Sequence, residues 1–128
     1  MEVAEVLRQF RPLRGVYGNV DGRELRYMFP EKLRFYCEGV EVLMTHIGGY
    51  PGRYAPAVRG ELLADPPQLF VCGHSHILKV IYDDKLRCLH MNPGAAGKQG
   101  WHKVRTVIRF VVDGKNMRDC EVIELGKK

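Results

Sequence analysis

The sequence predicts one mixed α/β domain whose C-terminal half is largely antiparallel. Its 128 residues suit a single domain with a sizeable core, and 45% hydrophobic with 27% charged residues is typical of a folded globular protein. Apolar residues recur at helical spacing in two separate segments. Most other apolar segments alternate with polar residues and lie in pairs around short turns, which predicts hairpins.

The N-terminal part of the chain predicts a helix, a strand and a helical turn. Glu2–Phe10 repeats its apolar residues every three or four positions and is followed by a proline, so we expect a helix there. Leu13–Tyr17 has the pattern of a strand, which the next glycine would end. Gly22–Phe29 has an ambiguous pattern, and we expect a short helical turn that the following proline closes.

The middle of the chain predicts a hairpin, a loop, a helix and a buried strand. Lys32–Cys37 and Val40–Thr45 flank a Glu-Gly turn, which indicates a hairpin. Ile47–Tyr54 is rich in glycine and predicts a loop. Ala55–Ala64 has helical spacing and is followed by two prolines. Leu69–Cys72 is wholly apolar, as expected of a strand covered on both faces.

The C-terminal half predicts two hairpins separated by a loop. Ile77–Tyr82 and Leu86–Met91 flank an Asp-Asp-Lys turn. Asn92–Gly100 is glycine-rich and is expected to be a loop. Val104–Val112 and Met117–Leu125 flank an Asp-Gly turn, which is a strong hairpin signal. The whole chain, residues 1–128, is therefore expected to be one domain.

Composition indicates which kinds of partner and which cellular compartment to expect. Lys plus Arg number 20 against 15 Asp plus Glu, which favours anionic partners, although scattered basic residues also occur on ordinary solvated surfaces. No apolar segment reaches the roughly 20 residues that a membrane helix needs, and the N-terminus has no signal-peptide pattern. The four cysteines have no paired spacing, so we expect buried free thiols in a reducing cytoplasm.

The stretch "VCGHSHILKV" places two of the five histidines, His74 and His76, where the strand Leu69–Cys72 ends. In an extended segment, residues i and i+2 point the same way, so we expect both imidazoles to converge at the carboxyl end of this strand. A lone histidine is more often a buried, hydrogen-bonded core residue. A pair in this position favours a functional site instead.

Three other predicted strands also end in polar residues. Asn19 and Asp21 follow the first strand, His46 follows Thr45, and Asn92-Pro93-Gly94 follows the strand that ends at Met91. Each has an ordinary alternative. Asn19 is also suited to capping a turn, His46 to burial, and Asn-Pro-Gly to a simple turn.

Together the motifs Gly-Asn-x-Asp, Thr-His, Gly-His-x-His and Asn-Pro-Gly resemble the calcineurin-like metallophosphoesterases, and within them the small single-domain bacterial and archaeal phosphodiesterases. The resemblance covers residues 2–124. It implies a β-sandwich flanked by helices, with two divalent metal ions on strand-end loops between the stacked sheets. Manganese is the expected metal, with nickel, zinc and magnesium as alternatives. Two such ions neutralise a phosphodiester and activate water for in-line attack.

The resemblance also implies roles for individual residues. Asn19, His46 and His74 would bind one metal, and His76 would bind the other. Asp21 would orient a ligand by hydrogen bonding. In the loop beside the site, Asn92 and Gly94 would lie next to the substrate, with backbone N–H groups available to an anion. Two further histidines, His90 on a strand and His102 on a surface loop, match no ligand position.

The sequence departs from the family pattern at its start. It contains neither the Asp-x-His nor the Gly-Asp that end the first two strands of the family, so it resembles a member lacking the N-terminal strand-helix-strand portion. Without those carboxylates we expect no two-metal site, and only weak binding of Zn²⁺ or Ni²⁺ through His46, His74 and His76. The strand Leu13–Tyr17 would become an exposed edge, through which we expect the chain to self-associate.

Two substitutions bear on the substrate. Val20 stands where larger phosphatases of the superfamily have a histidine that protonates the leaving group, which favours a phosphodiesterase over a monoesterase. Ile47-Gly48-Gly49 replaces a second histidine and suggests a reshaped substrate loop.

Three functions follow from this resemblance. The leading one is a metal-dependent phosphodiesterase, or the C-terminal part of one. The second is a catalytically inactive protein-interaction module with the same fold, as in the retromer subunit that resembles these enzymes. The third is a nuclease or nucleic-acid binder, which the lack of interleaved aromatic and basic residues does not favour.

Overall fold

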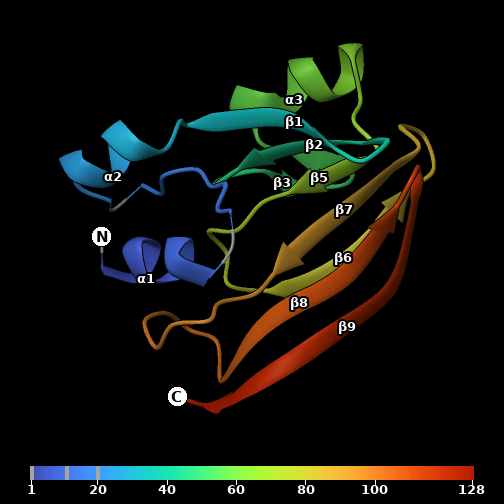
Figure 1. Cartoon of the computed structure of the whole chain (residues 1–128). Coiled ribbons are helices and arrows are strands. Elements are labelled where there is room, and N and C mark those ends of the chain that lie inside the picture. The colour runs from blue at the N-terminus through green and yellow to red at the C-terminus, as the bar shows by residue number, and fades with distance from the viewer. Residues whose placement is uncertain (1, 11, 20) are drawn as a thin grey trace.

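The computed structural model describes residues 2–10, 12–19 and 21–128, and none of the helices in these ranges is long and apolar enough to cross a membrane. Figure 1 shows the arrangement. The elements are, in chain order, α1 (Glu2–Phe10), α2 (Arg23–Met28), β1 (Lys32–Cys37), β2 (Val40–Thr45), β3 (Gly49–Tyr50), β4 (Arg53–Tyr54), α3 (Pro56–Ala64), β5 (Leu69–Val71), β6 (Leu78–Asp83), β7 (Cys88–Pro93), β8 (Val104–Asp113) and β9 (Asn116–Lys127).

The main sheet has five strands in the order β1-β2-β5-β7-β6. The β1–β2 and β6–β7 pairs are antiparallel hairpins, as predicted, and β5 lies between them, parallel to both β2 and β7. Leu69 and Phe70 of β5 are buried, which confirms the prediction of a strand covered on both faces. Since β2 and β5 run parallel, their carboxyl ends lie at the same edge of the sheet.

The two faces of this sheet are covered by different elements. Leu69 points to one face, where it packs with buried Val40, Val42 and Met91 against side chains of the β8–β9 hairpin. Phe70 points to the other face, where it packs with Leu43 against Val58 and Leu62 of α3. Figure 1 shows α3 on one side of the sheet and β8–β9 on the other. This arrangement confirms the predicted mixed α/β sandwich with helices on its outside.

The segment Leu13–Tyr17 corrects one prediction. This segment is not paired in a sheet. The Tyr17 N–H donates instead to the Pro30 carbonyl at 3.1 Å. A strand forms only where a neighbouring strand offers its edge, and among the described strands none lies beside this segment. The exposed strand edge that was predicted for this segment is therefore absent.

The glycine-rich segment 47–54 is more ordered than predicted. It contains the two-residue strands β3 and β4, which pair as a small hairpin. Gly49 and Gly52 have φ angles of 76° and 83°, a region that other residues rarely adopt, and this allows the tight turn. Sequence patterns miss such a hairpin because two-residue strands show no alternation.

The cysteines divide into two groups. All four are described and free; Cys72 and Cys88 are buried, whereas Cys37 and Cys120 are exposed. Burial raises the pKa of the Cys72 thiol to about 11 and that of Cys88 to about 12. The expectation of buried thiols is therefore right for two of them. The other two lie on β1, an edge strand of the main sheet, and on β9, in the hairpin that covers it, and are exposed there.

Candidate functional site

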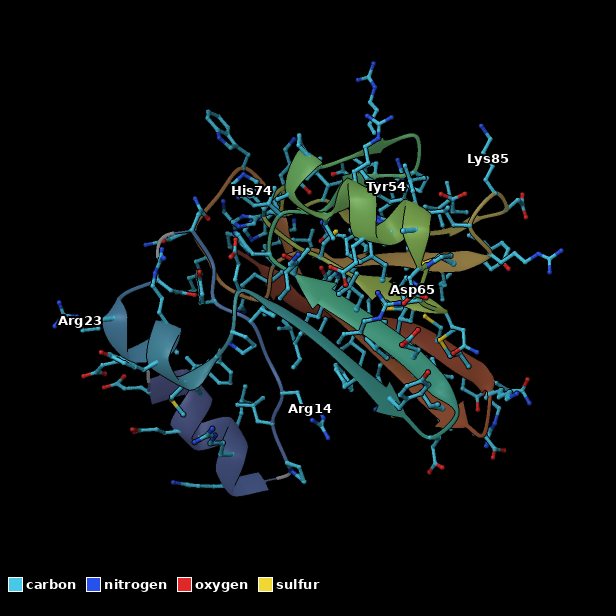
Figure 2. The ribbon with its side chains drawn as sticks, turned by 90° about the horizontal axis from the view of Figure 1, so that it is seen from above. Arg14, Arg23, Tyr54, Asp65, His74 and Lys85 are labelled. Atoms are coloured by element: carbon cyan, nitrogen blue, oxygen red, sulfur yellow. The ribbon has the colours of Figure 1, made fainter. Side chains whose placement is uncertain are left out.

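Three of the predicted ligands meet at one edge of the main sheet. His46 follows β2 and His74 follows the short strand β5, so the parallel pairing of these strands places both side chains at the same edge. Asn19 reaches them from the segment between α1 and α2. Figure 2 shows His74 and Lys85, which lies in the β6–β7 turn, on opposite sides of Tyr54. The strand-end reasoning therefore located this site.

The donor atoms of the three side chains lie close together. His46 Nε2 is 2.8 Å from Asn19 Oδ1 and 3.3 Å from His74 Nδ1. The rings of His46 and His74 are nearly perpendicular, with centroids 5.1 Å apart. Neighbouring ligands of a cation with bonds of about 2.1 Å are separated by roughly 3.0–3.4 Å. We call Asn19, His46 and His74 the Asn19 triad. His46 Nε2 lies at about this spacing from the His74 nitrogen and slightly closer to the Asn19 oxygen, so the group is a candidate site for one cation.

The environment keeps His46 uncharged. Burial is the main cause that lowers its pKa, and the neighbouring His74 adds to the effect, whereas the carboxylate of Asp21 opposes it. A neutral imidazole is the form that binds metals, because a proton on the nitrogen competes with the ion. The lowered pKa of His46 therefore favours cation binding, in which the ion would replace the proton that Nε2 shares with Asn19 Oδ1.

Acid is expected to destabilise the fold through His46 and the buried His90. Burial also lowers the pKa of His90, so both imidazoles resist protonation in the folded state, whereas the unfolded chain takes up protons below about pH 6.5. Stability is therefore unaffected by these groups above that pH and falls below it. Urea midpoints at pH 7.5, 6.0 and 5.0 test this, and His90→Gln should reduce the fall. Midpoints that stay constant across this range would contradict it.

His76 is not placed as predicted. His74 and His76 have φ angles of 66° and 60°, so the segment is left-handed at both residues and not extended. The rule that i and i+2 share a direction does not apply to such a backbone. The His76 ring instead packs edge-on against His102, with centroids 5.0 Å apart. His102 is therefore half-buried against a predicted ligand and is not a free surface residue.

The described residues do not fit a second cation. Among them, no three His, Cys, Asp or Glu side chains lie close enough to hold a metal ion. A carboxylate that acts on His46 is that of Asp21, which accepts a hydrogen bond from the Gly18 N–H at 2.6 Å and so holds the turn that carries Asn19. Two divalent ions side by side need anionic ligands to offset their repulsion. The residues fit one cation and not a pair.

Asn92 ties the histidine loop to the end of β7. It is buried, and its Nδ2 donates to the Gly73 carbonyl at 3.0 Å and to Ser75 Oγ at 3.1 Å. Its Oδ1 accepts from the Gly94 N–H at 3.0 Å, so that N–H is already engaged by Asn92. The predicted loop residues thus shape the backbone around His74.

Ser75 is a residue that sequence reasoning missed. Its Oγ lies 2.7 Å from the hydroxyl of Tyr50 and accepts from the Ile77 N–H at 3.2 Å, in addition to its bond with Asn92. These bonds hold the left-handed turn between the two histidines. A serine between two histidines has no distinguishing sequence signal, because its partners come from segments far away in the chain.

The glycine at position 48 has a structural explanation. A Cβ at Gly48 would lie 2.6 Å from the ring of Phe70 and 2.7 Å from Cys72 Cβ, closer than real atoms approach. The close packing of this loop on the core therefore requires a glycine there, whatever the substrate. Val20, where larger phosphatases have a histidine, lies outside the described residues.

Comparison with known families identifies the superfamily of the chain. The model of the calcineurin-like phosphoesterase superfamily domain matches residues 1–115, most of the chain. The chain belongs to the calcineurin-like phosphoesterase superfamily. A search of curated proteins returned no match to this phosphoesterase domain.

Solved structures show the same fold. Wild-type Vps29 from Entamoeba histolytica complexed with Zn²⁺ superposes with a TM-score of 0.70 at 15% identity, covering 96% of this chain and 75% of the other. A Thermotoga maritima protein solved by NMR gives 0.63 at 23% identity, covering 98% and 74%. An archaeal phosphodiesterase gives 0.63 at 18% identity, covering 86% and 67%. At these identities the likeness is one of fold.

Proposed function

We propose that this phosphoesterase domain is a metal-dependent phosphodiesterase, or the C-terminal part of one, in which the Asn19 triad holds a divalent cation. The observation that carries the proposal is the position of His46 Nε2, within 3.3 Å of donor atoms on both Asn19 and His74. Two imidazoles and an amide favour Zn²⁺ or Ni²⁺, while the family resemblance favours Mn²⁺. The expected compartment is the cytoplasm.

The cation, the residues of the Asn19 triad and the loop beside them would have different roles. A bound divalent ion supplies charge neutralisation for a phosphodiester and lowers the pKa of its water. His46 is held neutral by its surroundings, and Asn19 and His74 approach it from two different segments of the chain. The loop held by Asn92 and Ser75 keeps His74 in place, so the donor atoms are positioned before any ligand arrives.

Metal-dependent hydrolysis of bis(4-nitrophenyl) phosphate tests this function. We expect release of nitrophenol with Mn²⁺ or Zn²⁺ and a loss of at least about 100-fold for His74→Ala, because a missing ligand costs more than the 10–100-fold typical of a lost supporting hydrogen bond. His102→Ala is the matched control, since it removes an imidazole outside the triad. Rates equal to those of the metal alone would contradict the catalytic proposal.

A second candidate function, a protein-interaction module, is favoured by the surface of α1. Val3, Val6 and Leu7 lie on this helix with 72%, 51% and 48% of their surfaces exposed. Apolar side chains grouped on one helix are unusual on a monomer and mark contact surfaces. The chain shares its fold with Vps29, and a shared fold is compatible with either function.

Self-association is expected to proceed through this helix. We propose that copies of the chain bury Val3, Val6 and Leu7 against one another, so sedimentation at micromolar concentration should show species larger than a monomer. Leu7→Glu should shift the distribution toward the monomer, whereas Glu5→Gln, an exposed polar change on the same helix, should not. A clean monomer for the unaltered chain would contradict the proposal.

A further inference from the structure

A cavity opens directly beside the Asn19 triad. It has a volume of about 660 Å³ and is lined by Asn19 and His46 on the side of the triad. Its other walls are formed by the aromatic ring of Tyr17 and by the first turn of α3, where Ala57 and Val58 contribute apolar surface. A volume of this size falls within the range of about 300–1,000 Å³ that small-molecule sites have. The cavity is therefore large enough for an organic group next to the proposed metal position.

The cavity also contains a positioned cation, Arg26. The Arg26 Nε donates to the Asp21 carbonyl at 3.0 Å, and its guanidinium lies over the Tyr17 ring, 4.4 Å from the centroid. These two contacts fix the side chain while its Nη atoms form no salt bridge within the described residues. The α2 helix that carries Arg26 lies on the same side of the molecule as the site, as the labels of Arg23 and His74 in Figure 2 show.

The other charged residues that line the cavity are less suited to bind an anion. Lys32 is engaged with Glu61, with Nζ 3.2 Å from the carboxylate oxygen. Glu31 also lines the cavity and opposes an anion close to it. Arg26 is therefore the group best suited to bind an anion, because its planar donors are pre-positioned and match carboxylate or phosphate geometry.

We propose that this cavity binds the organic substituent of a phosphate ester and that Arg26 recognises a second anionic group on that substituent. The inference rests on the proposed function, since it assumes that the first phosphate lies at the Asn19 triad. The volume of the cavity and the apolar surface of Ala57 and Val58 suit an organic part of nucleoside size. Arg26 is thus a specificity-determining residue that selects ligands carrying two separated anions.

Direct binding to the chain reconstituted with Zn²⁺, an ion that two imidazoles favour, tests the proposal without requiring catalysis. We would titrate adenosine 3′,5′-bisphosphate and adenosine 5′-monophosphate by calorimetry at one fixed ionic strength, and follow the amide signals of residues 17–26 by NMR. We expect the bisphosphate to bind about tenfold more tightly, the gain typical of one hydrogen-bonded ion contact. Arg26→Gln should remove this preference, and Arg26→Lys should retain part of it.

The matched control is Arg23→Gln, which makes the same charge change on the same helix outside this cavity and should leave the preference intact. Equal affinity for the two probes, an equal loss for both in Arg26→Gln, or no binding of either would overturn the inference. Failure of the hydrolysis test with a preserved Arg26-dependent preference would instead refute only the catalytic function. Melting curves for each variant would show that it is folded.

Discussion

Replacing His46 with alanine is expected to abolish retention of divalent metal by the chain. His46 Nε2 lies close to donor atoms of both Asn19 and His74. Without it, the remaining two side chains lose the ligand that links them into one site. We expect the affinity for Zn²⁺ to fall by more than about 100-fold, which exceeds the effect of losing a supporting hydrogen bond. Metal content after reconstitution and desalting, together with a competition titration, measures this.

The number of ions that the chain retains distinguishes a one-metal site from a two-metal site. The unaltered chain is expected to retain at most one ion, because among the described residues no three His, Cys, Asp or Glu side chains lie close enough to hold a metal ion, and only the proposed Asn19 triad remains for one. His102→Ala is the control for histidine removal, and we expect it to keep the ion, since His102 contacts His76 and not the triad. Two ions per chain would contradict the one-cation geometry and would require carboxylates from elsewhere.

The second large effect is expected in the core, from Phe70→Ala. Phe70 is fully buried at the centre of the main sheet, in register with Leu43 and His90, and its ring lies 6.0 Å from that of Tyr54. Deleting such a ring removes buried apolar surface and leaves a cavity, so we expect the free energy of unfolding to fall by about 3–5 kcal/mol. Urea denaturation, followed by circular dichroism, measures the change.

An exposed aromatic residue provides the control for this prediction. Tyr36 on β1 is 66% exposed, and Tyr36→Ala should change the free energy of unfolding by no more than about 0.5 kcal/mol. Since small domains are stable by only about 5–15 kcal/mol, Phe70→Ala is expected to leave the fold marginal. A loss below about 1 kcal/mol would show that the core repacks freely around the gap.

Local patterns predicted the paired strands well. The β1–β2 hairpin begins and ends at the predicted residues, because its alternation and its Glu-Gly turn are both local signals. The segment 13–17 was wrongly predicted as a strand, since its pairing depends on a neighbour and not on its own composition. The β3–β4 hairpin was missed because it depends on two glycine φ angles and shows no pattern of its own.

The candidate site was predictable to the level of strand ends and no further. Parallel pairing of β2 and β5 brings His46 and His74 to one edge, which the sequence order of strands already implies. The direction of His76 was not predictable, because it depends on a left-handed backbone at two histidines. The contact with His102 and the bonds of Ser75 depend on how distant loops meet, which no local pattern describes.

The left-handed backbone at His74 and His76 makes these two positions costly for the stability of the fold. Residues with a Cβ are less stable in that conformation than glycine by about 1–2 kcal/mol each, and asparagine tolerates it better than most. Glycine or asparagine at either position would therefore relieve backbone strain and stabilise the fold. The chain holds both imidazoles at this edge of the sheet on a backbone that glycine would adopt with less strain.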